Sequence, residues 1–218
     1  MNSRFLKLTL LGMFLVSVMI PGEAGAAENK EIHSQNQYLS QSAVELNSHL
    51  RKLWIDHVIW TRNYIVSAVA GMEDQEKVLA RLLQNQQDLG NAIKPYYGEA
   101  AGNKLAELLK EHILIAGKIV GAAKSGNQGD VEKYNKEWYR NADDIARFLS
   151  SANPNWSMKE LREQLHVHLQ LVTDAVVARI GKDWVADIHA FDKGEQHMIK
   201  LADTLTAGII KQFPKSFK

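Results

Sequence analysis

Three histidines lie on apolar faces of predicted helices, and they are the strongest chemical feature of this sequence. His57 sits within an apolar stripe that runs from Leu53 to Tyr64 at helical spacing. His112 follows 55 residues later and His168 a further 56 residues on, each in a similar apolar stripe. A buried imidazole must find a polar partner or it destabilises the core around it. The pattern therefore predicts three specific polar contacts inside the fold.

These histidines also lie at similar distances from the predicted helix ends. His57 and His112 each precede a helix-ending glycine by 14 residues, and His168 precedes one by 13 residues. On the following helix, Asp192 and Glu195 lie at a comparable distance beyond the turn. At a rise of about 1.5 Å per residue, all these positions fall within about one helical turn of a common level. We therefore expect one layer that holds three imidazoles and a carboxylate.

Such a layer has two chemical interpretations. Imidazole is the most common metal ligand, and helical bundles build metal sites from side chains that project inward. His57, His112 and His168 with Asp192 or Glu195 would suit zinc, and additional carboxylates would suit iron or manganese. Alternatively, each histidine is a core residue paired with a neighbouring acid or hydroxyl, and no cofactor is bound. The first interpretation predicts a protein that binds a metal ion or small ligand, and the second a non-catalytic structural or envelope-interaction protein.

Catalytic and cofactor motifs are incomplete in this sequence. Glu163 and His166 have the E-x-x-H spacing of di-iron bundles, but a second copy is absent. There is no glycine-rich phosphate loop and no Ser/His/Asp set at a recognisable spacing. An enzyme is therefore the third interpretation, after a ligand-binding protein and a structural protein.

The elements that position the histidines are predicted to be helices throughout. Ser157 with Glu160 forms a capping box at the start of one of them, and glycines or prolines mark the other boundaries. One apolar face on each helix and short turns between helices predict an all-α, up-and-down bundle built from three consecutive helical hairpins. The six predicted helices, within a single domain at 40–218, are 42–70, 74–93, 99–124, 130–151, 157–181 and 183–212.

The N-terminal residues predict export. Residues 1–26 contain Arg4 and Lys7, a 13-residue apolar run at 8–20, and an Ala24-x-Ala26 cleavage site. The apolar run is shorter than the about 20 residues that a membrane-spanning helix requires. We expect a cleaved signal peptide, a flexible polar leader at 27–39, no stable transmembrane anchor after cleavage, and a secreted or extracytoplasmic protein.

Composition excludes several classes of site and partner. The sequence contains no cysteine, so disulfides, thiolate metal sites and cysteine nucleophiles are excluded together. Beyond residue 26 there are 24 basic and 24 acidic side chains, and without a basic excess we expect no nucleic-acid partner. The sequence identifies no protein partner.

Three segments carry a resemblance to known proteins: LWIDHVIWTRNYIVSA, YYGEAAGNKLAELLKEH and EWYRNADDIARFLSSANPNW. Together they resemble a group of uncharacterised secreted bacterial helical proteins. The resemblance implies an exported helical fold and assigns no catalytic residues. Some proteins of that kind are labelled glycosyltransferases, which would imply an α/β fold with alternating strands. No strand pattern is found in this sequence, so the residues do not support that label.

Overall fold

The computed structural model describes residues 40–218, which form helices and no strands. The predicted all-α class is therefore confirmed for this part of the chain. Predicted and observed helix boundaries agree to within a few residues, and residues 40–218 belong to one compact unit. The elements are α1 (Gln41–Ala70), α2 (Gln75–Ser125), α3 (Gln128–Ala152), α4 (Met158–Ile180), α5 (Trp184–Gln212) and a short 3-10 helix, η1 (Pro214–Phe217).

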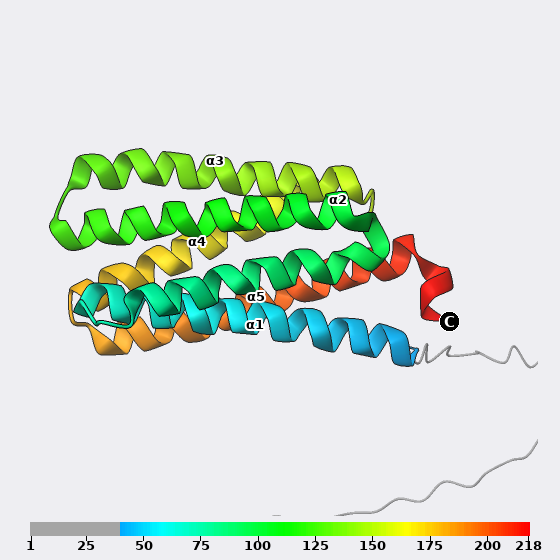
Figure 1. Ribbon diagram of the computed structural model, residues 1–218, viewed down its shortest axis with the longest axis horizontal. Coiled ribbons are helices and arrows are strands. Elements are labelled where there is room, and N and C mark those ends of the chain that lie inside the picture. Colours follow the sequence, from blue (N-terminus) through cyan, green and yellow to red (C-terminus); the bar gives the residue numbers. More distant parts are fainter. Residues whose placement is uncertain (1–39) are drawn as a thin grey trace, which may run out of the picture. The chain divides into compact units, whose positions relative to one another are not determined.

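Helix α2 contains a chain reversal, which accounts for five observed helices where six are predicted. Within α2, Gly98 alone is non-helical, with φ 82° and ψ 170°, a region that glycine adopts without steric cost. A Cβ atom on Gly90 would lie 2.4 Å from the carbonyl oxygen of Gly102, although these residues would be about 18 Å apart on a straight helix. The two halves of α2 therefore run antiparallel (Figure 1) and correspond to the predicted helices 74–93 and 99–124.

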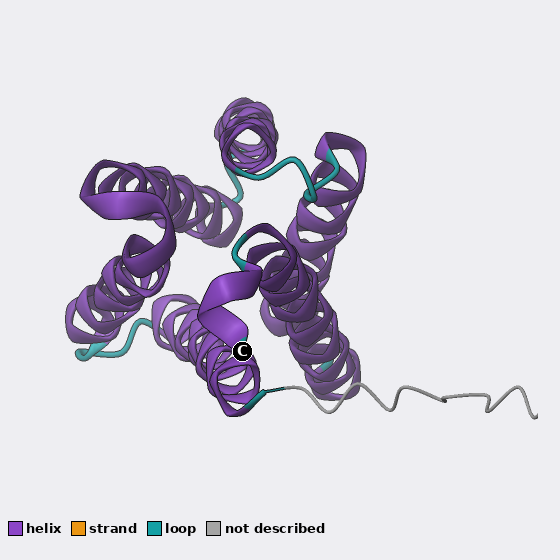
Figure 2. Cartoon of the chain, turned by 90° about the vertical axis from the view of Figure 1, so that its right-hand side faces the viewer, coloured by secondary structure: helices purple, strands orange, loops and turns teal. Residues whose placement is uncertain are grey.

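The helices pack in a closed ring. Each helix packs against the next one in the chain, and α5 packs against α1, so the last helix covers the first. Figure 2 shows the ring end-on, with the helices surrounding a common axis. Large apolar side chains fill the interior, and those that are almost completely buried include Leu50, Leu82, Leu89, Ile145, Leu161, Leu169, Met198, Leu201 and Ile209. This ring brings α1, α4 and the second half of α2 to face one another.

Local sequence signals explain where these helices begin and end. The Ser157 side chain accepts a hydrogen bond from the Glu160 backbone N–H at 3.3 Å, as the predicted capping box requires. Gly71 and Gly126 end α1 and α2 in the left-handed conformation. The histidines of α1 and α2 are therefore held at fixed distances from well-defined helix ends.

The buried face of α5 differs from the predicted one. The apolar pattern of Trp184 and Ile188 predicts that they point inward, yet they are 51% and 55% exposed. Asp187 and Gly194 are buried instead, whereas Met198, which shares the predicted apolar stripe, is buried as expected. Asp187 can occupy an interior position because two arginines bind its carboxylate, as described below. The inward face is thus rotated relative to the prediction, and this rotation decides where the acidic residues of α5 lie.

The signal peptide predicted at 1–26 and the leader predicted at 27–39 lie outside the described residues. Within residues 40–218, no helix is long and apolar enough to cross a membrane.

A close contact between α5 and Trp156 provides a test of the packing. A Cβ atom on Gly208 would lie 1.9 Å from Trp156 Nε1, whereas one on Gly121 would meet nothing within 4 Å. Gly208→Ala should lower the free energy of unfolding by about 2 kcal/mol or more because the buried indole must move. Gly121→Ala should raise it by about 0.5–1 kcal/mol through helix propensity. Urea unfolding of both variants measures these changes, and equal effects would contradict the packing.

Candidate ligand site at the histidine layer

The three predicted histidines meet in the core. His57, His112 and His168 come from α1, the second half of α2 and α4, and they are only 2%, 4% and 4% exposed. The ring centroids of His57 and His168 are 5.5 Å apart, and those of His112 and His168 are 6.3 Å apart. The prediction that these residues share one layer is therefore confirmed. His168 occupies the central position because it lies next to both of the others.

His112 has a fixed hydrogen-bonding partner. Its Nδ1 lies 2.8 Å from Asn141 Oδ1, and Asn141 Nδ2 donates to the backbone carbonyl of Leu108 at 3.2 Å. Because the Asn141 amide donates to Leu108 through nitrogen, its oxygen must accept, so Nδ1 of His112 carries the proton. The other ring nitrogen, Nε2, is then a hydrogen-bond acceptor or a metal ligand. Asn141 is itself only 1% exposed.

His57 lies beside a second buried amide. Gln86 Nε2 donates to the carbonyl of Leu82 at 2.7 Å and to Asn85 Oδ1 at 3.0 Å. Neither His57 Nδ1 nor Gln86 Oε1 forms a hydrogen bond within residues 40–218. The Gln86 side chain is nevertheless close enough to His57 to favour its protonated form. Gln86 is therefore a polar neighbour of His57.

His168 differs from the other two because no side-chain hydrogen bond contributes to its pKa, whereas Gln86 contributes for His57 and Asn141 for His112. Its Nδ1 is buried and forms no hydrogen bond with any residue in 40–218. A buried polar atom without a partner costs roughly 1–3 kcal/mol. Natural folds retain few such atoms, and each calls for an explanation, which a bound molecule would provide.

Burial keeps all three imidazoles neutral. It lowers the pKa of His57 from 6.5 to about 3, with a smaller contribution from His112. Burial also lowers the pKa of His112 to about 4, although the hydrogen bond to Asn141 acts in the opposite direction. For His168, burial and the neighbouring His57, His112 and His197 all lower the pKa well below its ordinary value. The layer therefore offers lone pairs and N–H groups at neutral pH, not positive charges.

The predicted carboxylates do not join this layer. Asp192 is exposed and Glu195 is partly exposed, because α5 turns Gly194 and Met198 inward at this level. Within the described part of the chain, no group of three or more histidine, aspartate or glutamate side chains is arranged to hold a metal ion. The five-residue metal set predicted from sequence is thus divided into three histidines that meet and two acids that lie apart from them.

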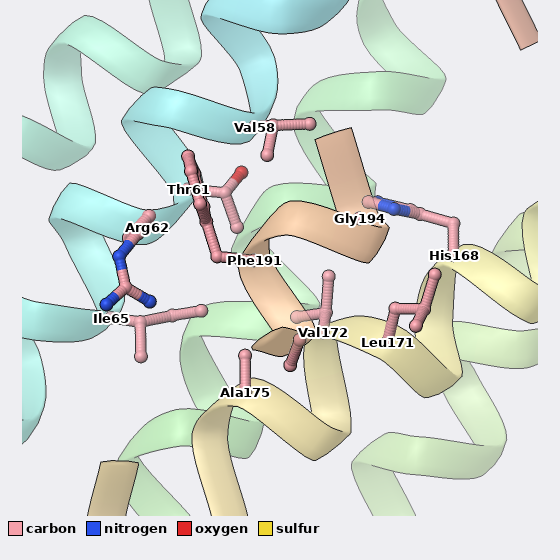
Figure 3. Close-up of a pocket in the computed structure, with 11 residues that line it drawn as sticks. Val58, Thr61, Arg62, Ile65, His168, Leu171, Val172, Ala175, Phe191 and Gly194 are labelled. Carbon is pink, nitrogen blue, oxygen red and sulfur yellow. The ribbon is translucent and has the colours of Figure 1, made fainter. Parts of the chain in front are cut away.

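An apolar cavity of about 30 Å³ leads to His168 from the junction of α1, α4 and α5. Figure 3 shows His168 and Arg62 on opposite sides of this cavity, with Thr61, Phe191 and Val172 between them. The Thr61 hydroxyl is a second buried polar atom without a partner in residues 40–218. The residues that line the cavity are therefore mostly apolar, and two of them carry a buried polar atom without a partner in residues 40–218.

A second, larger cavity of about 80 Å³ lies next to the first one. Thr61, Ile65 and Val172 line both cavities and therefore form the partition between them. The wall of the second cavity is apolar except for hydroxyl groups and the indole of Trp138, whose Nε1 is buried without a partner in residues 40–218.

An ion cluster that the sequence did not reveal lies at the rim of the first cavity. Arg62 donates to both oxygens of Asp187, at 2.6 and 2.8 Å, and Arg179 donates to one of them at 3.0 Å. Burial acts to raise the pKa of Asp187, but the two arginines outweigh burial and hold it below its ordinary value. Asp187 is 1% exposed, so this cluster fixes the rotation of α5 against α1 and α4.

Other acids form pairs on the surface. Asp144 pairs with Arg147, while Asp143 accepts a hydrogen bond from His166 at 2.8 Å if that ring nitrogen is protonated. Half-exposed pairs of this kind contribute little to stability.

Comparison of the chain with models of protein families, with curated proteins and with solved structures gives no match. The interpretation of this site therefore rests on its residues and geometry.

The difference between His168 and His112 can be tested by replacing each with leucine. His168→Leu removes an unpaired nitrogen and should raise the free energy of unfolding at neutral pH by about 1 kcal/mol. His112→Leu leaves Asn141 without its partner and should lower it by about 1–3 kcal/mol. Urea unfolding at neutral pH measures both values. A loss of stability in His168→Leu as large as that in His112→Leu would show that His168 is already satisfied.

The lowered pKa values also predict a pH dependence of stability. Below about pH 6.5 the unfolded chain gains protons on these histidines while the folded chain does not, so stability falls as pH decreases toward the folded values of about 3–4. Each histidine should contribute about 1.4 kcal/mol per pH unit within this window. Urea unfolding between about pH 7 and pH 5 measures the slope, which His168→Leu should reduce by the contribution of one proton. An unchanged slope in that variant would contradict the assignment.

Proposed function

We propose that this protein is a non-catalytic, exported binding protein that holds a small ligand in the cavity beside His168. The observation that carries the proposal is the position of His168, a buried residue that lines an apolar cavity and whose Nδ1 lacks a partner in residues 40–218. A ligand with a hydrogen-bonding group would satisfy this atom. Support for export comes from the sequence of residues 1–26 alone.

The size of the cavity supports a small ligand. A water molecule requires a cavity volume of about 10–15 Å³. The cavity beside His168 has a volume of about 30 Å³, so it accommodates a fragment of only a few heavy atoms. The apolar lining favours an alkyl body, while His168 Nδ1 and the Thr61 hydroxyl favour one polar group on it. Hydrogen bonds inside an apolar pocket select strongly between similar ligands, because the wrong ligand leaves a buried atom unpaired.

A divalent metal is the second candidate, and its support is the neighbourhood of His112 and His168, although no group of three side chains in residues 40–218 is arranged to hold an ion. Asn141 leaves Nε2 of His112 without a proton, and the His168 ring lies 6.3 Å from the His112 ring between centroids. Zinc, with solvent completing the coordination that Asp192 and Glu195 do not provide, is the ion best suited to imidazole ligands alone. The structural alternative, with all three histidines as satisfied core residues, leaves His168 Nδ1 without an explanation.

Matched small molecules separate these possibilities. We expect 1-butanol to shift the methyl NMR signals of Ile65 and Val172 in a saturable way, and 1-chlorobutane, which has a similar length but no hydroxyl, to bind roughly tenfold more weakly, the size expected for one good hydrogen bond. His168→Leu should abolish this preference. Because Gly194 lines the cavity and a Cβ there would meet nothing within 4 Å, Gly194→Leu should fill the space and block both probes.

Titration of the same protein with zinc tests the metal candidate. If the metal interpretation holds, zinc raises the melting temperature of the parent protein but raises that of His112→Leu and His168→Leu much less, because only a ligand of the native state stabilises by mass action. If neither alcohol nor zinc has a saturable effect, the structural alternative is the better account.

A further inference from the structure

The rim of the cavity carries a surplus of positive charge. Two guanidinium groups, those of Arg62 and Arg179, bind the single carboxylate of Asp187. Arg62 uses Nη1 and Nη2 for this contact, and each guanidinium has five N–H donors. The cluster as a whole is therefore cationic and retains donors for another anion.

This charge is accessible and lies close to the apolar space. The Arg62 side chain is 23% exposed and lines the cavity, where it is the only charged residue, since His168 is neutral. The centre of its guanidinium group lies 5.1 Å from the centroid of the Phe191 ring, which also lines the cavity. Phe191 thus holds the guanidinium at the rim.

The cavity consequently has two different polar ends. Arg62, which is partly exposed, lines one side of the cavity, and the buried His168, whose Nδ1 has no partner in residues 40–218, lines the other, with apolar side chains between them (Figure 3). A ligand that matches both ends carries an anionic group at one end and a hydroxyl group at the other. The residues between the two ends are apolar, so an alkyl chain is the natural link between the two polar groups of the ligand.

We propose that the ligand is a short, unbranched hydroxycarboxylic acid, with its carboxylate on Arg62 and its hydroxyl on His168. This inference rests on the proposed ligand site and specifies the chemical class that the site selects. A carboxylate matches a guanidinium fork in shape and charge. Its negative charge also balances the second arginine of the cluster, which Asp187 alone does not.

Three probes of equal length that differ only in the group at one end test the charge. The anion 4-hydroxybutyrate, the neutral 1,4-butanediol and the cation 4-amino-1-butanol are titrated against the full helical domain, with the methyl signals of Ile65 and Val172 as readout. We expect the anion to bind roughly tenfold more tightly than the diol, which is the size of one charge-assisted hydrogen bond, and the cation to bind more weakly than the diol. Added salt should weaken only the binding of the anion.

Arginine variants locate the effect. Arg62→Met should remove the preference for the anion over the diol, measured as the ratio of their affinities within the same variant, and Arg62→Lys should restore part of that ratio. Asp187 keeps Arg179 as its partner in both variants, so the fold retains a paired carboxylate. The matched control is Arg51→Met. Arg51 also joins α1 to α5, through Asp203 at 2.6 Å, but it does not line the cavity. This variant should bind all three probes as the parent protein does.

The inner end is tested with butyrate, which lacks the hydroxyl group. We expect 4-hydroxybutyrate to bind more tightly than butyrate in the parent protein and equally in His168→Leu. Equal binding of the anion, diol and cation would overturn the inference about charge and leave the ligand site standing. Failure of all these probes, together with failure of 1-butanol, would remove the ligand site itself.

Discussion

Removal of three imidazoles from water is the constraint on which much of this structure depends. A histidine in the core is tolerated only as a neutral ring, and a neutral ring still has one donor and one acceptor to satisfy. Asn141 and Gln86 are buried on neighbouring helices where they serve His112 and lie beside His57. The amides are in turn oriented by the backbone carbonyls of Leu108 and Leu82. The polar layer therefore requires particular side chains on several helices. His168 is the member of the layer whose Nδ1 has no partner in residues 40–218 and that has no amide contact of this kind.

The sequence predicted the histidine layer because its signal was periodic and local. Helical spacing placed His57, His112 and His168 inward, and their distances from the helix ends placed them at one depth. The sequence could not predict the orientation of α5, since Trp184 and Ile188 suggested the wrong face. The observed face depends on Arg62 and Arg179, which lie on other helices. Long-range ion pairs leave no periodic pattern in a single sequence. For this reason Asp192 and Glu195 were predicted as metal ligands, although the fold turns them away from the histidine layer.

The chain reversal at Gly98 shows a similar division between local and distant information. Pro95 predicted an interruption, and separate helices at 74–93 and 99–124 were the correct consequence. The close approach of Gly90 and Gly102 depends on which helix surfaces meet after the reversal. The cavities arise in the same way, because Thr61, Ile65 and Val172 belong to two helices that meet across the ring. The sequence shows that such residues are apolar or small, but it does not show the size of the cavity that remains between them after the helices pack.

Closure of the ring has a consequence for the order of events during folding. The hairpins join neighbouring segments and form quickly, whereas α1 and α5 must meet across most of the chain, as Arg51 and Asp203 do over a separation of 152 residues. Arg62 from α1 and Phe191 and Gly194 from α5 become neighbours only at that late step. The cavity is therefore absent from any intermediate built of hairpins alone. A ligand held there would recognise only chains in which α5 has been synthesised and docked, and its binding would slow the reopening of the ring.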